Sequence, residues 1–525
     1  MPDGAGACPT TVTANDTSAM RELPAYFMRH WPRPRSVSFE TAQQTYGTLK
    51  RWGRTRFQIV KGKLYFSRRA ADGAWGCVLR RTPILAWSLL ELLERYPTLP
   101  DVDIPVNCRD KPTFWDPHGK RRPRPGFEAA TTSVPRDGHA ALAFSYTTGR
   151  TFTDVPLPDY TYWGLPYADL PPWREWLRHS GDPNRNPPWE RKRDGAIWVG
   201  SPTHPLRAAF QRCAGARFAP GQLTMRMAGK EAMETLAWRC PPHSPPRAAS
   251  AAPAGHAGAP EASSAGCTRK PSGWTPMQEQ CRYRFILHFP GISDWLEHLK
   301  HQLACGSVSL FVVEAGADRR ATAASSTAAG PAAGPTATGS TAAGPTAGVA
   351  GAPNGGRHPG PPGEEEEEEG RVPLSPPPFE HFDFGGPLLR EDVHFVRVVL
   401  PPGAKGRAWV CERVGAVLDR LRSEPGKARC LAERGANLSR SISMAHVYAY
   451  YAEVLTRASR AQEEDVARRV VRAEGSWRVT KANFFRFISN RTRPWIEHTF
   501  RRWHREAFKA TPLLPPRQQL HGLFS

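Results

Sequence analysis

The chain has 525 residues, of which 40% are hydrophobic, so it can form two to four domains with sizeable cores and is not disordered throughout. Its formal net charge of +22 favours phosphates, anionic membrane surfaces or acidic polymers as partners. The basic residues are spread along the chain without a zinc-finger spacing, an RNP-type strand or a basic region leading into a heptad repeat, so we expect no nucleic-acid partner.

The beginning of the chain is polar, and we expect residues 1–20 to be disordered. They lack the basic start and apolar block of a signal peptide, and no run of 18 apolar residues marks a transmembrane helix. None of the ten cysteines forms a CxxC pair, so we expect buried thiols or disulfides rather than a structural zinc site.

Residues 21–190 alternate short apolar runs with turn signals, which is typical of an α/β domain. Residues 55–66 predict two strands joined by a Lys-Gly turn. Residues 82–96 carry apolar side chains at helical spacing, and residues 102–106 predict a strand that ends in a loop.

A second α/β domain is expected over residues 191–460, with low-complexity inserts at 241–273 and 315–372 that cannot bury enough apolar area to become ordered. Pro205 suits the first position of a helix that follows a glycine turn. The predicted strands are 196–199, 284–288, 308–313 and 394–400, and the predicted helices are 206–213, 295–304, 414–421, 427–440 and 447–458. Residues 461–525 form a basic aromatic tail, which either packs on the body, as we favour, or makes a peripheral membrane contact.

The turn after the strand at 196–199 has the features of a phosphate site. Gly200, Ser201 and Thr203 precede a helix that carries Arg207, so backbone N–H groups, hydroxyls and a guanidinium can meet an anion. Because there is no GxGxxG or Walker motif, an ordinary strand–helix turn is the alternative.

A second glycine loop has the same character. Gly291, Ile292 and Ser293 lead into a helix that carries His298 and Lys300, which suits a diphosphate. The alternative is a simple helix cap.

A carboxylate lies on the loop after the strand at 102–106. Asp110 is therefore expected at the edge of an α/β sheet where ligands bind. One aspartate is sufficient to take a proton from an attacking hydroxyl as a general base. The alternative is a surface ion pair with Arg109 or Lys111.

Tyr162 and Trp163 belong to an aromatic group that includes Trp173, Trp176 and Trp189. Exposed aromatic rings stack on sugar faces and on peptides. Core packing is the alternative, and the residues alone favour it.

Several other chemistries lack their signatures, since the sequence contains no GxSxG elbow, no HExxH and no kinase motif set. One Asp-x-Asp, formed by Asp101 and Asp103, matches a metal-chelating pattern of sugar transferases. We expect it at the beginning of a strand rather than on a loop after one, which favours metal-independent chemistry.

Taken together in chain order, these segments give the chain a resemblance to glycosyltransferase family 90, the protein O-glucosyltransferase family, over about residues 45–460 without the two inserts. The matching segments are Leu-Pro-Asp-Val-Asp-Ile-Pro-Val-Asn-Cys-Arg-Asp at 99–110, Phe144-Ser145, Tyr160-Thr161-Tyr162-Trp163, Gly200-Ser201 with Thr203 and Arg207, Tyr283-Arg284-Phe285, Leu303-Ala304-Cys305-Gly306-Ser307 and Leu431-Ala432-Glu433-Arg434-Gly435.

The resemblance implies a GT-B fold, in which two Rossmann-like domains face a cleft, here with long disordered inserts. It implies Asp110 as the general base of an inverting reaction that moves a sugar, glucose or xylose, from a uridine diphosphate (UDP) sugar to a protein or polysaccharide hydroxyl. It implies no metal and no other cofactor, and we expect a monomer. The implied donor residues are Gly200, Ser201, Thr203, Arg207, Gly291, Ile292, Ser293, His298 and Lys300, the acceptor residues are Tyr162 and Trp163, and the disulfide is Cys281–Cys305.

Two departures from the family pattern weaken the expected donor site. Val199 and His298 stand where many members carry arginine, so the donor phosphate loses at least one guanidinium partner. The resemblance also implies the lumen of the endoplasmic reticulum or Golgi. Because the visible N-terminus has no signal peptide, we expect a truncated or atypical N-terminus rather than a cytosolic enzyme.

Overall fold

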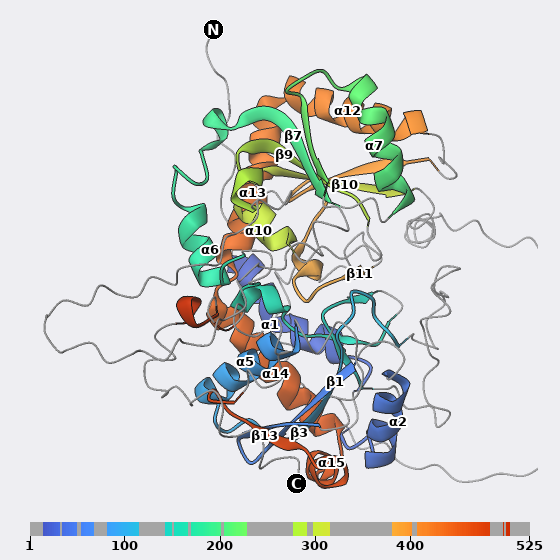
Figure 1. The fold of residues 1–525 in the computed structure, drawn as a ribbon, viewed down its shortest axis with the longest axis vertical. Helices are drawn as coiled ribbons and strands as arrows, with labels where there is room; N and C mark the ends of the chain where they lie inside the picture. Colours follow the sequence, from blue (N-terminus) through green and yellow to red (C-terminus); the bar gives the residue numbers. More distant parts are fainter. Residues whose placement is uncertain are drawn as a thin grey trace, which may run out of the picture.

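The computed structural model describes much of the chain outside the two inserts. The described residues are 14–31, 34–49, 54–67, 81–114, 142–149, 152–165, 170–200, 204–227, 277–290, 298–314, 381–401, 407–483, 497 and 500–504. Figure 1 shows two lobes, one around β1, β3 and β13 and the other around β7, β9 and β10. The two sheets make this a mixed α/β protein, consistent with two Rossmann-like domains.

The sheet of the first lobe is mixed, with strand order β13-β2-β1-β3-β4-β6. Its strands are β1 (Arg54–Val60), β2 (Lys63–Phe66), β3 (Val102–Asn107), β4 (Phe144–Ser145), β6 (Val155–Pro156) and β13 (Trp477–Val479). Strands β13, β2, β1 and β3 pair antiparallel, whereas β3, β4 and β6 pair parallel. The predicted hairpin is confirmed: Lys61 and Gly62 form its two-residue turn with positive φ angles of 48° and 68°, as a type I′ turn requires.

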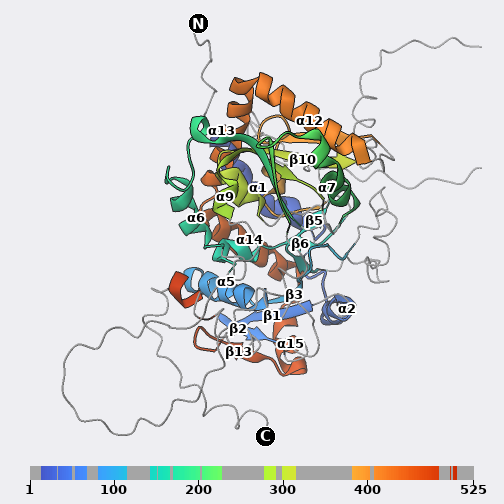
Figure 2. The ribbon, with the colours of Figure 1, turned by 45° about the horizontal axis from the view of Figure 1, so that its top comes forward.

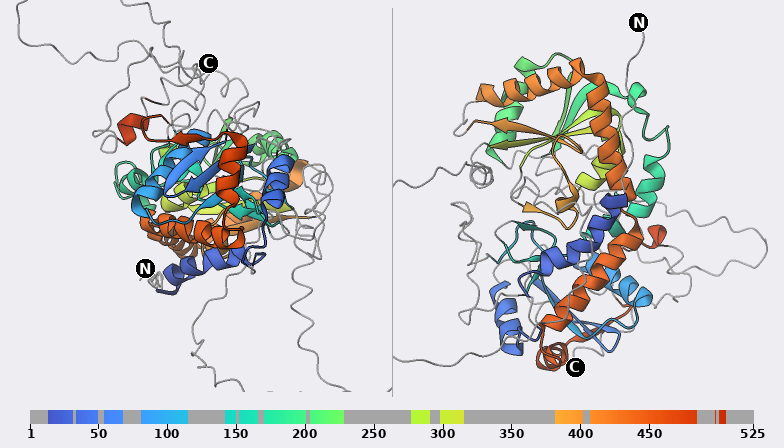
Figure 3. Two further views of the ribbon diagram at one scale, coloured as in Figure 1. Left: turned by 90° about the horizontal axis from the view of Figure 1, so that it is seen from below. Right: turned by 180° about the vertical axis from the view of Figure 1, so that it is seen from behind.

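Helices cover both faces of this first sheet. In Figure 2, α5 (Thr82–Arg95) lies on one face and α15 (Val466–Glu474) on the opposite face. The α2 helix (Phe39–Leu49) packs beside α15. The α14 helix (Met444–Ala461) packs against α5 and also along α1 (Ala14–Met28), as the right-hand view of Figure 3 shows.

The position of α1 corrects one prediction. The helix begins at Ala14 and buries Ala19, Met20 and Leu23. The expectation of disorder over residues 1–20 is therefore wrong from Ala14 onward, because apolar contacts with α14 order a segment whose own sequence is mostly polar.

The sheet of the second lobe is entirely parallel, with strand order β12-β10-β9-β7-β8. Its strands are β7 (Arg193–Gly200), β8 (Leu223–Met227), β9 (Tyr283–His288), β10 (Val308–Glu314) and β12 (Val396–Leu400). Counted along the chain, the order from the β8 edge is 2-1-3-4-5, the arrangement of a doubly wound fold. Its order reverses between β7 and β9, which is the switch point where such sheets bind ligands.

The helices of the second lobe are α7 (Pro205–Arg217), α10 (Leu299–Ala304), α12 (Arg407–Ser423) and α13 (Pro425–Ser441). Pro205 is the first residue of α7, as predicted. The α7 helix packs against α12, and Phe210, Leu310 and Val414 belong to the apolar core that these helices form with the sheet.

The end of the described chain returns to the first lobe. Val447, Tyr451 and Leu455 of α14 lie in the first core, and β13 pairs with β2 as the edge strand of the first sheet. These segments fall within the predicted second domain (191–460) and tail (461–525), so the structure divides the chain differently from those limits. The part of the tail that is described packs on the body: the Phe500 ring lies 5.2 Å from that of Trp87.

Short elements fill the junction between the lobes. A two-stranded sheet joins β5 (Thr148–Gly149) of the first lobe to β11 (His381–Phe382), which leads to β12 of the second. The remaining elements are η3 (Tyr160–Trp163), α6 (Trp173–Ser180), η5 (Trp189–Arg191), α9 (Met277–Gln280) and η6 (Gly386–Leu388).

All six cysteines that the structure describes are disulfide-bonded; they are Cys108, Cys213, Cys281, Cys305, Cys411 and Cys430. The Cys213–Cys411 bond joins α7 to α12 across 198 residues of sequence, a pairing that the sequence analysis did not predict. Within the described part of the chain, no helix has the length and apolar character needed to cross a membrane.

Candidate functional site

The loop that carries Asp110 follows β3 and is held by its own polar side chains. Asn107, the last residue of β3, donates from Nδ2 to Lys111 O (2.6 Å) and to Thr113 Oγ1 (2.7 Å). The buried carboxylate of Asp154 accepts from the backbone N–H of Thr113 at 2.8 Å. The backbone on both sides of Asp110 is therefore anchored at this end of the sheet.

Asp154 is an unusual anchor, because a buried carboxylate is costly without a cation. Burial raises the pKa of Asp154 to about 7, although the backbone N–H groups of Thr113 and Phe114 act in the opposite direction. Near neutral pH this side chain therefore exists as a mixture of acid and carboxylate.

The side chain of Asp110 differs from this buried anchor, because 42% of its surface is exposed. Its Oδ1 lies 2.6 Å from Nη1 of Arg81, which is 17% exposed. Sequence reasoning considered Arg109 and Lys111 as partners and missed Arg81. No local pattern signals this pair, since Arg81 precedes α5 and meets Asp110 only through the fold.

The Asp110 loop lies beside the junction of the lobes. The hydroxyl of Thr147 donates to the backbone oxygen of Asp110 at 3.4 Å. Thr148, the next residue, pairs with Phe382 in the β5–β11 sheet that connects the lobes. The loop that carries the candidate general base thus contacts the segment that joins the two lobes.

In the second lobe, two predicted donor residues, Gly200 and Arg207, lie at the switch point between β7 and β9. Gly200 ends β7, and Arg207 of α7 donates from Nη2 to Phe289 O (3.0 Å), just after β9. Arg207 therefore links the two strands between which the strand order reverses. Burial lowers the pKa of this guanidinium. The predicted donor residues Ser201, Thr203, Gly291, Ile292 and Ser293 lie outside the described residues.

The first turn of α7 is already partly capped. His204 accepts the backbone N–H of Leu206 on Nδ1 at 3.2 Å, and its backbone oxygen accepts from Ala208 at 3.1 Å. The helix start therefore offers fewer N–H groups to an anion than the sequence pattern implied. Binding of an anion at this turn would therefore depend more on the Arg207 side chain.

His288 is the last residue of β9 and is buried at the carboxyl end of that strand. The sequence analysis did not select it as a candidate site residue. Its ring stacks on Phe311 at 4.6 Å, and burial lowers its pKa to about 3, so it is neutral at physiological pH. Phe311 packs with Leu389, which also contacts the first core. The second sheet is therefore linked through Leu389 to the core of the first lobe.

The Lys300 side chain, predicted to bind the donor, contacts the first lobe. Its Nζ donates to Asp159 Oδ2 and Thr161 Oγ1, both at 2.5 Å, and the side chain is 7% exposed. The ammonium therefore ties α10 of the second lobe to η3 of the first. His298 immediately precedes α10 and makes no side-chain cap bond.

The acceptor-facing prediction for Tyr162 and Trp163 is corrected. Their exposed fractions are 2% and 1%, so neither ring offers a face to a sugar or peptide. Trp163 donates from Nε1 to Glu91 at 2.9 Å, and Tyr162 packs on Phe384. Core packing, the alternative reading of these aromatics, is what the structure contains.

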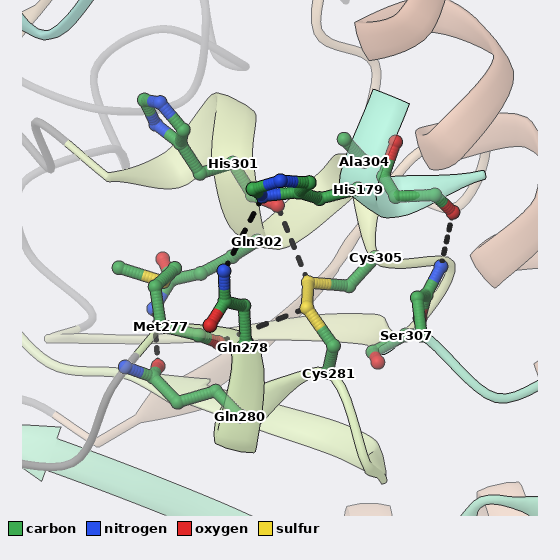
Figure 4. Close-up of a disulfide and its surroundings, with 12 residues drawn as sticks. His179, Met277, Gln278, Gln280, Cys281, His301, Gln302, Ala304, Cys305 and Ser307 are labelled. Carbon is green, nitrogen blue, oxygen red and sulfur yellow. Dashed lines mark hydrogen bonds between the residues drawn. A yellow bond between two sulfur atoms is a disulfide. The ribbon is translucent and has the colours of Figure 1, made fainter. Parts of the chain in front are cut away.

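The Cys281–Cys305 disulfide is present and joins the segments just before β9 and β10 (Figure 4). Around it, Nε2 of Gln302 donates to Gln280 at 2.8 Å, and Nε2 of Gln278 lies 3.4 Å from the His179 ring. The bond lies at the amino ends of these strands. The two predicted donor residues of the switch point lie at the carboxyl ends, on the opposite edge of the sheet.

The Asp-x-Asp pair lies at the beginning of β3, as predicted. Asp101 pairs with Arg468 at 2.7 Å just before the strand, and Asp103 pairs with buried Arg56 at 2.7 Å within it. Among the residues that the structure describes, no three or more His, Cys, Asp or Glu side chains are grouped to hold a metal ion.

Comparison with known proteins identifies the family of the chain. Residues 30–318, more than half of the chain, match the family model described as Glycosyl transferase family 90. The chain belongs to this family. The chain is also 25% identical over 269 residues to the O-glucosyltransferase rumi homolog of Anopheles gambiae, a match that covers 50% of this chain and 52% of that protein. The chain therefore matches about half the length of this curated relative.

Membership of family 90 confirms the resemblance noted in the sequence. The disulfides together with the family are consistent with a secretory-pathway lumen, because disulfides persist in oxidising compartments.

Proposed function

We propose that this protein is an inverting, metal-independent glycosyltransferase that moves glucose or xylose from a UDP-sugar to a hydroxyl of a protein or polysaccharide. The observation that carries the proposal is that the Asp110 loop of the first lobe contacts the segment that joins the lobes, while Arg207 lies at the switch point of the parallel sheet in the second lobe. Two Rossmann-like lobes that hold acceptor and donor in this way would form a GT-B enzyme.

In this mechanism the acceptor hydroxyl gives its proton to the Asp110 carboxylate while its oxygen attacks the anomeric carbon of the donor. The bond from that carbon to the UDP oxygen breaks at the same time, so the configuration inverts. UDP leaves with its electron pair, and the guanidinium of Arg207 stabilises the negative charge that develops on the diphosphate. Gly200 and the loops at 201–203 and 291–293 complete the proposed donor site.

Three further observations support the details. The relative's name contains O-glucosyltransferase, which supports glucose as the donor sugar. Both carboxylates of the Asp-x-Asp pair are engaged by arginines, which supports chemistry without a metal bound there. The disulfides support a lumenal site of action, for which we propose the endoplasmic reticulum or Golgi.

The test is UDP release from UDP-glucose, UDP-xylose and UDP-galactose in the presence of a metal chelator, for wild type and Asp110→Asn. We expect turnover of one donor, reduced about 100-fold to 10,000-fold in the variant, because an amide cannot accept the proton. UDP should raise the melting temperature of both proteins equally. Asp182→Asn, at a partly exposed aspartate after α6, is the matched control and should keep full activity.

Turnover that survives in Asp110→Asn would show that another group is the base. If no donor is bound or hydrolysed, the departures at Val199 and His298 have removed the donor site, and a binding protein that kept the fold becomes the better description. Activity that disappears with the chelator and returns with added metal would contradict the metal-independent mechanism.

A further inference from the structure

Arg81 occupies a fixed place beside the Asp110 loop. Its Nη1 lies 2.6 Å from Asp110 Oδ1 and donates to the backbone oxygen of Cys108 at 2.9 Å. Cys108 itself is buried and disulfide-bonded, so the carbonyl that receives Arg81 belongs to a restrained part of the loop. One guanidinium nitrogen thus contacts both the loop backbone and the candidate base.

Two buried tyrosines support the guanidinium from the first core. The Cζ atom of Arg81 lies 4.7 Å from the ring centroid of Tyr160 and 6.0 Å from that of Tyr146. The two rings pack edge to face at 5.0 Å, and both are at most 1% exposed. A cation held over aromatic faces is attracted independently of any carboxylate, so Arg81 is positioned before Asp110 meets it.

This arrangement distinguishes the two oxygens of Asp110. The Oδ1 atom is buried from solvent and meets Arg81 as an ion pair without hydrogen-bond geometry, whereas 42% of the whole side chain is exposed. The exposed area therefore lies on Cβ, Cγ and Oδ2. Oδ1 is therefore closed to an incoming hydroxyl, which leaves Oδ2 as the oxygen that could accept its proton.

We propose that Arg81 is the positioning residue of the general base, holding Oδ1 of Asp110 so that Oδ2 faces the acceptor. This inference rests on the proposed function of Asp110. Asn107 and Asp154 fix the backbone of the loop, but they contact neither oxygen of Asp110 in the interactions described above. Arg81 is therefore the group that sets the orientation of the carboxylate itself.

The experiment compares kcat and the donor KM of Arg81→Met and Arg81→Lys with wild type and Asp110→Asn. Activity is expressed per UDP-binding site, counted by calorimetry, so that loss of folded protein does not count as loss of catalysis. The matched control is Arg397→Gln, which removes another 2.6 Å ion pair, to Glu391, on β12 of the second lobe.

We expect Arg81→Met to lower kcat about 10-fold to 100-fold with the donor KM unchanged, since a misplaced base affects the chemical step and not donor binding. Arg81→Lys should lose less, about 3-fold to 10-fold, because an ammonium keeps the charge but lacks the planar guanidinium that packs over Tyr160. Arg397→Gln should keep wild-type kcat.

An Arg81→Met enzyme with wild-type kcat per site overturns this proposal, while loss of activity in Asp110→Asn still upholds the function. Retained activity in Asp110→Asn overturns the proposed function instead. If Arg81→Met does not fold, Arg81→Lys decides, and a kcat equal to wild type overturns the positioning role.

Discussion

The two lobes of this protein bury different kinds of groups in their sheets. The second lobe stacks apolar side chains between a parallel sheet and its helices, with Phe210, Leu310 and Val414 in its core. The first lobe also has a large apolar core, but one face of its sheet buries a charged network. There Arg56 pairs with Asp103 at 2.7 Å and with Glu474 of α15 at 2.6 Å, and all three side chains are fully buried.

The difference follows from how the chain builds each lobe. The second lobe is made from the chain between β7 and α13, with each strand followed by a crossover. The first lobe closes only when α14, α15 and β13 return from the other end of the chain. Arg56, which pairs with Asp103, can also pair with Glu474 only when α15 packs at one position on the first sheet. The charged network therefore fixes the position of α15. The following predictions test this contrast.

The largest effect is expected from breaking the buried network. Asp103→Ala leaves Arg56 buried without its bidentate partner and should lower the free energy of unfolding by about 3–5 kcal/mol. Denaturant unfolding measures this. The control is Asp101→Ala, two residues earlier, whose ion pair with the half-exposed Arg468 should contribute about 1 kcal/mol or less. Equal effects of the two substitutions would mean that buried charge does not hold the first lobe together.

A smaller effect is expected at the junction. Lys300→Met removes two charge-assisted hydrogen bonds, to Asp159 and Thr161, and should lower the free energy of unfolding by about 1.5–3 kcal/mol. UDP affinity should not change, because the ammonium faces the first lobe rather than the donor edge. Calorimetry with UDP and denaturant unfolding measure the two quantities.

Lys481→Met is the control for this substitution, since its ion pair with Glu94 lies at the surface and should contribute little. A variant of Lys300 that is fully stable but no longer binds UDP would restore the donor role that the sequence indicated.

The smallest effect concerns pH. Because burial raises the pKa of Asp154 to about 7, above its ordinary value of 3.8, the folded protein binds this proton more tightly than the unfolded chain. The stability that this group contributes is therefore present at low pH and is lost as the pH rises from about 4 to about 7.

Asp154→Asn should accordingly lower the free energy of unfolding most near pH 4, by about 1 kcal/mol, and less at pH 8. Denaturant unfolding at several pH values measures the trend. Asp419→Asn, at the surface of the second lobe, is the control for a half-exposed aspartate. A difference between wild type and Asp154→Asn that grows as the pH rises would contradict the sign of this shift.

Much of the local structure was predictable. The β1–β2 hairpin, α5, β3, β7 and α7 form where the apolar spacing and turn residues predicted them, because these signals act over a few neighbouring residues. Strands β7, β9, β10 and β12 of the second lobe were predicted for the same reason, since each is a short apolar run, whereas β8 was not predicted. Motif order also indicated the family, which the family match confirms.

Contacts between distant segments were not predictable. Periodicity cannot tell whether the aromatic Tyr162 and Trp163 face a ligand or a core. Only the packing of Phe384 and of α14 on them decides. Lys300 beside a glycine loop suggested a phosphate ligand, but its charge is satisfied by Asp159, which lies 141 residues earlier.

The sequence by itself therefore determined the local elements, the family and the identity of Asp110 as the residue to test, because each depends on a short pattern. Only the tertiary structure decided which lobe the C-terminal segments complete, which lysine is structural and which arginine meets the candidate base. Those outcomes depend on burial and charge pairing between segments that the chain brings together only when it folds.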